Sequence, residues 1–220
     1  MGLDRRPARL VKSGGRPHRF GAGSPAGQGP RSAPGVVTRA WRATGASVRG
    51  TLHRRHGIPN QDAVLWSPPY GSADFAATAV AAGHGSNRWF RSAAGARVAV
   101  EVGLTLVSDV MARATSSRDA AALEQLSQRL TETWTETVAA DLERHAFSEQ
   151  ELKQLEVQEG PDARVEVLEG PALAYGTTLL LAGADERGVV LLQIGDGDIL
   201  TVSEAGAVTR PLPPDPRSVG

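Results

Sequence analysis

Two stretches in the middle of the chain place apolar residues at the spacing of an α-helix. In the first, from about Ser92 to Ala114, apolar positions recur every three or four residues: Ala93, Ala96, Val100, Leu104, Val107 and Met111. In the second, which Ser117 can cap, the apolar positions are Leu123, Leu126, Leu130, Trp134, Val138 and Leu142. Charged residues occupy much of the remaining surface of the second stretch. The pattern predicts two long helices, each with one face on a core.

The segments on either side have the short apolar runs of strands. Three strands are expected before the helices, over 43–50, 62–66 and 73–81, and a loop with His53, His56 and Pro59 lies between the first two. After the helices, the runs 177–182 and 189–194 predict an antiparallel hairpin, followed by a strand over 199–202. The acidic residues 148–170 are weakly patterned, and we expect a loop with at most one helical turn. Strands, two helices and a strand meander indicate an α+β fold.

The first 42 residues differ in composition from the rest. They are rich in arginine, glycine and proline, and Asp4 is their one acidic residue. Such a segment buries too little apolar surface to offset its ordering entropy, so we predict a disordered leader over 1–42. An arm that binds an acidic partner such as nucleic acid, or a misassigned start codon, would give the same composition. A domain over 43–210 and a proline-rich end over 211–220 complete the expected organisation.

The overall composition excludes several classes of protein. The chain has 24 basic and 24 acidic residues, so no net charge favours nucleic acid or an anionic membrane as a partner. It has no cysteine, which excludes disulfides and thiolate zinc sites and leaves oxygen and imidazole as metal ligands. No apolar run reaches the roughly 18–20 residues that span a bilayer, and the N-terminus lacks the apolar core of a secretory signal. We expect a cytoplasmic protein.

Four short motifs occur in an informative order. They are Asn60-Gln61-Asp62, Ala82-Gly83-His84-Gly85, Gly176-Thr177-Thr178 and Gly195-Asp196-Gly197-Asp198. Their order and the two helices between the second and third resemble the bacterial-type metal-dependent protein serine/threonine phosphatases (PPM, type 2C). The resemblance covers about 44–210. It implies a β-sandwich flanked by helix pairs, in α-β-β-α layers, of which the C-terminal part is missing here.

The resemblance also implies roles for individual residues. Asp62 matches a metal ligand, and Gly83 matches the residue that offers its backbone carbonyl to the metal. His84 matches the proposed general acid, and Asp196 matches an acidic position near a further metal. The implied cofactors are two Mn²⁺ or Mg²⁺ ions, which would activate a water for hydrolysis of a phosphate monoester. The implied partners are a phosphorylated protein or its kinase, with no membrane or nucleic acid.

Three departures from the family pattern lead us to expect weak activity or none. Ala82 stands where the family has an aspartate that bridges both metals. The family's later Asp-Gly-x-x-Asp and Asp-Asn motifs do not occur, so we expect a truncated domain. Gly57 replaces a phosphate-binding arginine, for which Arg55 or His56 are the candidate substitutes.

Two alternatives to a phosphatase stay open. One is a non-catalytic descendant of the family, a pseudophosphatase that binds a kinase, a phosphoprotein or a partner subunit through the same surface. The other is a zinc hydrolase built from His53, His56 and His84, although no glutamate base lies near these histidines in the sequence.

Overall fold

The computed structural model describes residues 9–11, 40–113 and 120–212. Most of the predicted leader, the predicted cap Ser117 and most of the proline-rich end lie outside the described residues. Two parts of the leader are described: Arg9–Val11 is a short strand paired with the sheet, and within 40–42 Trp41 forms an isolated bridge with Ala73.

One antiparallel sheet organises the domain, in the order β1-β5-β4-β3-β2. Its strands are β1 (Arg9–Val11), β2 (Ala63–Ser67), β3 (Phe75–Ala81), β4 (Leu179–Asp185) and β5 (Gly188–Ile194). The β4–β5 hairpin and the two strands before the helices confirm the predictions from apolar runs. Because the strands are antiparallel, the start of β2, the end of β3, the start of β4 and the end of β5 lie at the same end of the sheet.

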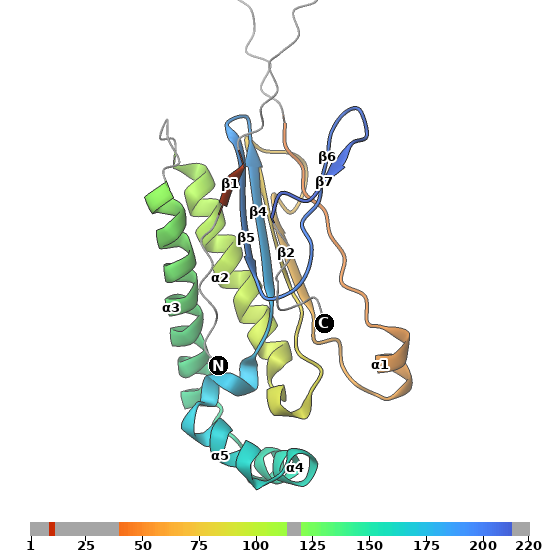
Figure 1. Cartoon of the computed structure of the whole chain (residues 1–220), viewed down its shortest axis with the longest axis vertical. Helices are drawn as coiled ribbons and strands as arrows, with labels where there is room; N and C mark the ends of the chain where they lie inside the picture. Colours follow the sequence, from red (N-terminus) through yellow and green to blue (C-terminus); the bar gives the residue numbers. More distant parts are fainter. Residues whose placement is uncertain (1–8, 12–39, 114–119, 213–220) are drawn as a thin grey trace, which may run out of the picture.

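Two long helices, α2 (Ser92–Ala112) and α3 (Ala120–Arg144), cover one face of this sheet (Figure 1). Both predictions from helical spacing are confirmed. Small residues allow close packing of α2 on the strands, since a β-carbon on Gly103 would come within 2.7 Å of Leu181. The core forms between these layers and includes Ala79, Val100, Val107, Leu130, Trp134, Val138, Leu181 and Leu192.

Two further helices follow α3, where we predicted a loop. They are α4 (Glu149–Glu159) and α5 (Pro161–Glu169), so the loop prediction for 148–170 is wrong. Ser148 and Glu151 form a capping box at the start of α4, and Pro161 occupies the first turn of α5. Two 3₁₀ turns, η1 (Asn87–Trp89) and η2 (Pro171–Tyr175), connect this helical unit to the rest of the domain.

On the opposite face of the sheet lie loops, and Val80 there is 43% exposed. One small hairpin follows β5, formed by β6 (Thr201–Val202) and β7 (Val208–Thr209). The expected strand over 43–50 is absent. This segment lies against β2, where Gly45 contacts Val64 and Trp66, and it continues into the short helix α1 (Thr51–Arg55). The α+β class is confirmed, and β6–β7 is all that the described residues contain of a second sheet.

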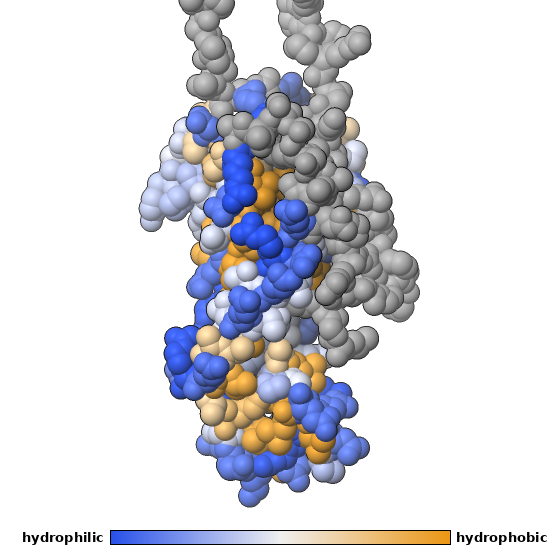
Figure 2. All heavy atoms as spheres, turned by 90° about the vertical axis from the view of Figure 1, so that its left-hand side faces the viewer, coloured by the Kyte–Doolittle hydropathy of each residue, from blue (hydrophilic) through white to orange (hydrophobic). Residues whose placement is uncertain are grey.

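The surface around α3 is largely hydrophilic, with apolar side chains toward the end of the molecule that carries α4 and α5 (Figure 2). The exposed large apolar residues on these two helices are Val157, Val165 and Leu168. Among the described residues, no helix has both the length and the apolar character needed to cross a bilayer.

Candidate active site

The four sequence motifs meet at one end of the sheet. Asp62 immediately precedes β2, Gly83 follows β3, Thr177 and Thr178 precede β4, and Asp196 follows β5. The antiparallel order brings these four strand ends together in the sequence β5, β4, β3, β2. Asp62 and Asp196 therefore lie on the same side of the domain, with the ends of β3 and β4 between them.

Hydrogen bonds to two threonines hold the segment that begins at Ala82. The Ala82 carbonyl accepts from the Thr178 backbone N–H at 3.0 Å and from the Thr177 hydroxyl at 2.9 Å. The Ala82 N–H donates to the Thr178 hydroxyl at 3.3 Å. Both polar backbone groups of Ala82 are thus satisfied within the protein. Ala82 itself is exposed.

Gly83 lies too close to its neighbours for a side chain. A β-carbon there would come within 2.6 Å of the Gln61 carbonyl oxygen and 3.0 Å of the Ser92 hydroxyl. This contact places the segment carrying Asp62 beside the segment carrying Gly83. The Asn60 amide donates to the Ser47 hydroxyl at 2.7 Å, which ties the loop before Asp62 to the segment over 43–50.

Asp196 projects from a turn that depends on glycine. Gly195 and Gly197 have φ values of 80° and 124°, which residues with a β-carbon rarely adopt. The Gln193 amide donates to both of their carbonyls, at 3.0 and 3.1 Å, and fixes the turn. Asp196 is exposed, whereas the Asp198 carboxylate is paired with Arg210 at 2.9 Å.

His84 occupies the loop between β3 and η1 and is partly buried. Its backbone carbonyl accepts a hydrogen bond at 3.0 Å from the hydroxyl of Ser92, the fully buried first residue of α2. A histidine held at this end of the sheet can donate or accept a proton there.

This geometry agrees with a family comparison, in which the model of protein phosphatase 2C matches residues 49–219. The chain belongs to the protein phosphatase 2C family. Comparisons with curated proteins and with solved structures found no match. Members of this family are metal-dependent phosphatases that act on phosphoproteins, so the resemblance predicted from the four motifs is confirmed.

The phosphatase 2C motifs do not complete a two-metal site here. The sheet end offers the carboxylates of Asp62 and Asp196 and the carbonyl of Gly83, and Ala82 offers no ligand. Within the part of the chain that the structure describes, no three His, Asp or Glu side chains are grouped so that they could hold a metal ion. His53, His56 and His84, which would have to converge in a zinc hydrolase, therefore do not form a metal-binding group.

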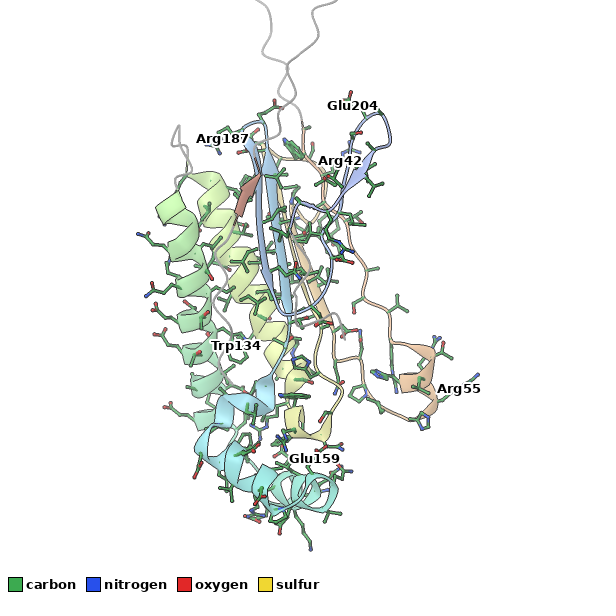
Figure 3. The ribbon with its side chains drawn as sticks, viewed as in Figure 1. Arg42, Arg55, Trp134, Glu159, Arg187 and Glu204 are labelled. Atoms are coloured by element: carbon green, nitrogen blue, oxygen red, sulfur yellow. The ribbon has the colours of Figure 1, made fainter. Side chains whose placement is uncertain are left out.

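The two candidate phosphate-binding residues lie on an arm of this phosphatase domain. Arg55 ends α1 and His56 caps it, and both are exposed. Figure 3 shows Arg55 pointing away from the sheet. These residues are close to the start of β2 in the sequence, but the Arg55 side chain points into solvent.

A polar network that sequence reasoning missed connects the helices beside the site. The Arg91 guanidinium donates to both Glu151 carboxylate oxygens, at 2.9 and 3.1 Å, and to the Tyr175 hydroxyl at 2.8 Å. The Tyr175 hydroxyl donates to Asp141 at 2.8 Å, and this bond lowers the pKa of Asp141. The hydrogen bond from Arg91 lowers the pKa of Glu151 from 4.5 to about 2. The one sequence signal for this network was the Ser148-x-x-Glu151 capping pattern.

We expect part of the stability of the domain to be lost in acid. Because the pKa of Glu151 is lower in the folded state, its contribution is complete above about pH 4.5 and falls as the pH drops from there toward 2. Glu151→Gln removes this dependence and costs about 1 kcal/mol at neutral pH, since solvent screens a carboxylate whose side chain is 33% exposed. Thermal unfolding between pH 7 and 3 measures both effects.

Glu204→Gln, on the exposed β6–β7 hairpin, is the matched control and should follow the unmodified chain at every pH. If the stability of Glu151→Gln and of the unmodified chain were equal at every pH, the Arg91–Glu151 ion pair would add nothing to stability.

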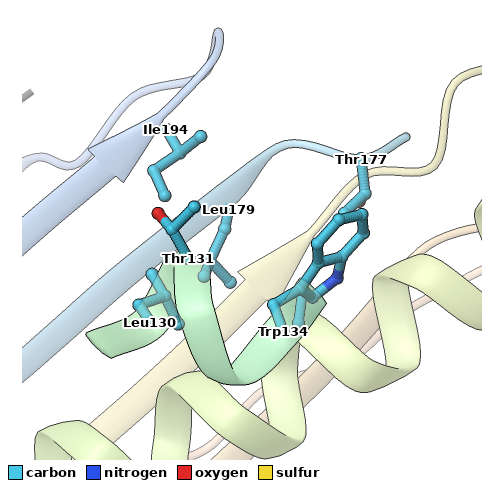
Figure 4. A pocket seen from close by; sticks show the side chains of 7 residues that line it. Leu130, Thr131, Trp134, Thr177, Leu179 and Ile194 are labelled. Carbon is cyan, nitrogen blue, oxygen red and sulfur yellow. The ribbon is translucent and has the colours of Figure 1, made fainter. Parts of the chain in front are cut away.

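A small apolar pocket lies behind the site, between α2, α3 and the sheet (Figure 4). Its volume is about 20 Å³, and its lining residues are Ala99, Leu130, Thr131, Trp134, Thr177, Leu179 and Ile194. The Thr131 hydroxyl donates to the Ser127 carbonyl and the Thr177 hydroxyl to Ala82, so both are already engaged. The pocket is a packing gap in the core, too small for a substrate.

Proposed function

We propose that this chain is a protein serine/threonine phosphatase domain of the 2C family whose hydrolytic activity is weak or absent. The observation that carries this proposal is Ala82. Its backbone is fixed by Thr177 and Thr178 at the centre of the sheet end, where a carboxylate would lie between Asp62 and Asp196. The scaffold of the site is therefore present, and its central ligand is replaced by a methyl group.

In this proposal, Asp62 and Asp196 supply carboxylates and Gly83 a backbone carbonyl to Mn²⁺ or Mg²⁺, hard cations that prefer oxygen ligands. In complete two-metal sites such cations neutralise the phosphate and lower the pKa of a water. Because the ligands present here fit only part of such a site, we assign it no catalytic step. Arg55 and His56 are the proposed phosphate-binding residues and would reach the site through movement of the arm that carries them.

His84 is the proposed proton donor. Departure of a serine or threonine alkoxide from a phosphate ester requires a proton, and a histidine is suited to supply it near neutral pH. The Ser92 hydrogen bond to the His84 backbone and the packing of Gly83 against Gln61 support this role, because they hold the histidine loop at the sheet end.

We expect the unmodified chain to hydrolyse p-nitrophenyl phosphate and phosphoserine peptides far more slowly than an ordinary enzyme, in Mn²⁺ or in Mg²⁺. The reason is the loss of the central carboxylate, which weakens metal binding and activation of water together. Steady-state kinetics test this expectation. A turnover in the ordinary range of about 1–10³ per second would show that Ala82 does not limit the site.

The second candidate function is a pseudophosphatase that binds a phosphoprotein or its kinase in the cytoplasm. It is favoured by the hydrogen bonds of Ala82 to Thr177 and Thr178, because these bonds hold the loop after β3 and need no metal. Under this function, capture of a phosphoserine peptide by the unmodified chain persists in a chelator and survives His84→Ala. Under the phosphatase function, capture weakens when the metal is removed.

A further inference from the structure

The side chain of His84 packs against the indole of Trp89. Their ring centroids are 4.5 Å apart, and the ring planes are inclined by 44°. Trp89 ends the 3₁₀ turn η1, five residues after His84, and both side chains are partly buried. One face of the imidazole is therefore limited by a large, rigid neighbour.

Gly176 limits the same pair of rings from another element. A β-carbon on Gly176 would come within 2.5 Å of Trp89 Cδ1, 2.8 Å of Trp89 Nε1 and 3.2 Å of His84 Cδ2. The two rings thus pack directly over the backbone at the junction of η2 and β4. Gly176 has a φ of −49°, which any residue can adopt, so close packing is the reason that a glycine is required.

The two turns that carry Trp89 and Gly176 are joined to each other. The Arg91 backbone N–H donates to the Ala174 carbonyl at 2.9 Å, and the Arg91 guanidinium donates to the Tyr175 hydroxyl at 2.8 Å. Arg91 lies two residues after Trp89, and Tyr175 immediately precedes Gly176. The polar network described above therefore fixes the spacing between the two surfaces that contact His84.

We propose that Trp89 is a positioning residue for His84, and that Gly176 and the Arg91–Tyr175 pair hold Trp89 in place for this purpose. The Ser92 hydroxyl holds the backbone carbonyl of His84 but not its side chain, so the ring needs other contacts to keep one orientation. A proton donor must lie within about 2.6–3.2 Å of its acceptor, and a displacement of 1 Å costs on the order of 10²-fold in rate. The role in proton transfer rests on the proposed function, whereas the positioning itself does not.

Nuclear magnetic resonance on the unmodified chain tests the contact first. The ring protons of His84, assigned by the loss of their signals in His84→Gln, should show nuclear Overhauser effects to the Trp89 indole and chemical shifts displaced by its ring current. Absence of both would overturn the proposal without reference to any variant or to activity.

Substitutions then test the role. In Trp89→Ala, the His84 ring signals should move toward the positions of an unconstrained histidine, whereas Trp89→Phe should retain most of the displacement. Gly176→Ala should also move these signals, because its new methyl group occupies the space of the indole. Trp66→Phe, which changes an indole on β2 that lies against Gly45, is the control and should leave them unchanged. Unchanged His84 signals in a folded Trp89→Ala protein would overturn the proposal.

The kinetic consequence separates this proposal from the proposed function. In an Ala82→Asp background, Trp89→Ala should lower kcat about tenfold or more and leave KM nearly unchanged, and Trp89→Phe should restore most of the loss. Equal kcat values with and without the indole would overturn the positioning role. If the Ala82→Asp protein shows no hydrolysis at all, the claim in the proposed function that Ala82 limits the site fails, and the resonance measurements still decide whether Trp89 positions His84.

Discussion

Ala82→Asp should raise the affinity of this chain for Mn²⁺ by at least about tenfold, and its rate of phosphate ester hydrolysis should rise with it. Removal of groups that only orient metal ligands already costs about 10–100-fold in affinity or activity, so a carboxylate placed directly between two others should contribute at least as much. The two effects should move together, because a bridging carboxylate binds the cations and thereby affects the water they activate. Isothermal titration calorimetry and p-nitrophenyl phosphate hydrolysis measure them.

Ala82→Asn is the matched control for this gain. It has nearly the same volume as the aspartate and lacks its charge, so it should add little affinity and no rate. A gain in affinity without any gain in hydrolysis would favour the binding module over the phosphatase. If neither property changes in Ala82→Asp, the sheet end is not a metal site.

Trp134→Ala should reduce the free energy of unfolding by about 3–5 kcal/mol, the usual cost of removing a large aromatic side chain from a core. The Trp134 side chain is buried between α3, α2 and the sheet, and its indole N–H donates to the Gly95 carbonyl at 3.1 Å. The substitution removes apolar contacts and the indole hydrogen bond, and it enlarges the adjacent pocket. Urea unfolding followed by circular dichroism measures the change.

Tyr70→Ala is the corresponding control, because Tyr70 is 91% exposed. It should change the free energy of unfolding by less than about 0.5 kcal/mol. A loss below about 1 kcal/mol for Trp134→Ala would contradict the packing of α3 onto α2 and the sheet.

The elements with a regular apolar repeat were predictable from the sequence. The helical spacing of apolar residues around Val100 and Trp134 predicted both long helices, and the apolar runs before and after Gly188 predicted the hairpin. The helices over 149–169 were missed because their buried residues are few: Leu152, Leu155, Ala163 and Val167. Their end signals, Ser148 with Glu151 and Pro161, were the better indication. The strand expected over 43–50 was wrong because this segment packs on side chains of β2 and pairs with no strand.

The candidate site was predictable to the level of strand ends. Asp62, Gly83 and Asp196 each adjoin a strand, and antiparallel pairing then places them at one end of the sheet. The contacts of His84 with Trp89 and Gly176 were not predictable, because they depend on two 3₁₀ turns that are far apart in sequence. The same holds for Arg91, whose partners Glu151 and Tyr175 come from other elements.

The central claim is that the phosphatase site of this chain lies at the sheet end around Ala82, and Mn²⁺ broadening of backbone amide resonances tests it most directly. In the Ala82→Asp protein, the signals of Asp62, Gly83, His84 and Asp196 should broaden first as Mn²⁺ is added. In the unmodified chain, the same signals should broaden only when the Mn²⁺ concentration is at least about tenfold higher, because the chain lacks the affinity that the carboxylate adds. Broadening that begins in the acidic helices α4 and α5 in both proteins, and leaves Asp62 and Asp196 sharp, would contradict the claim.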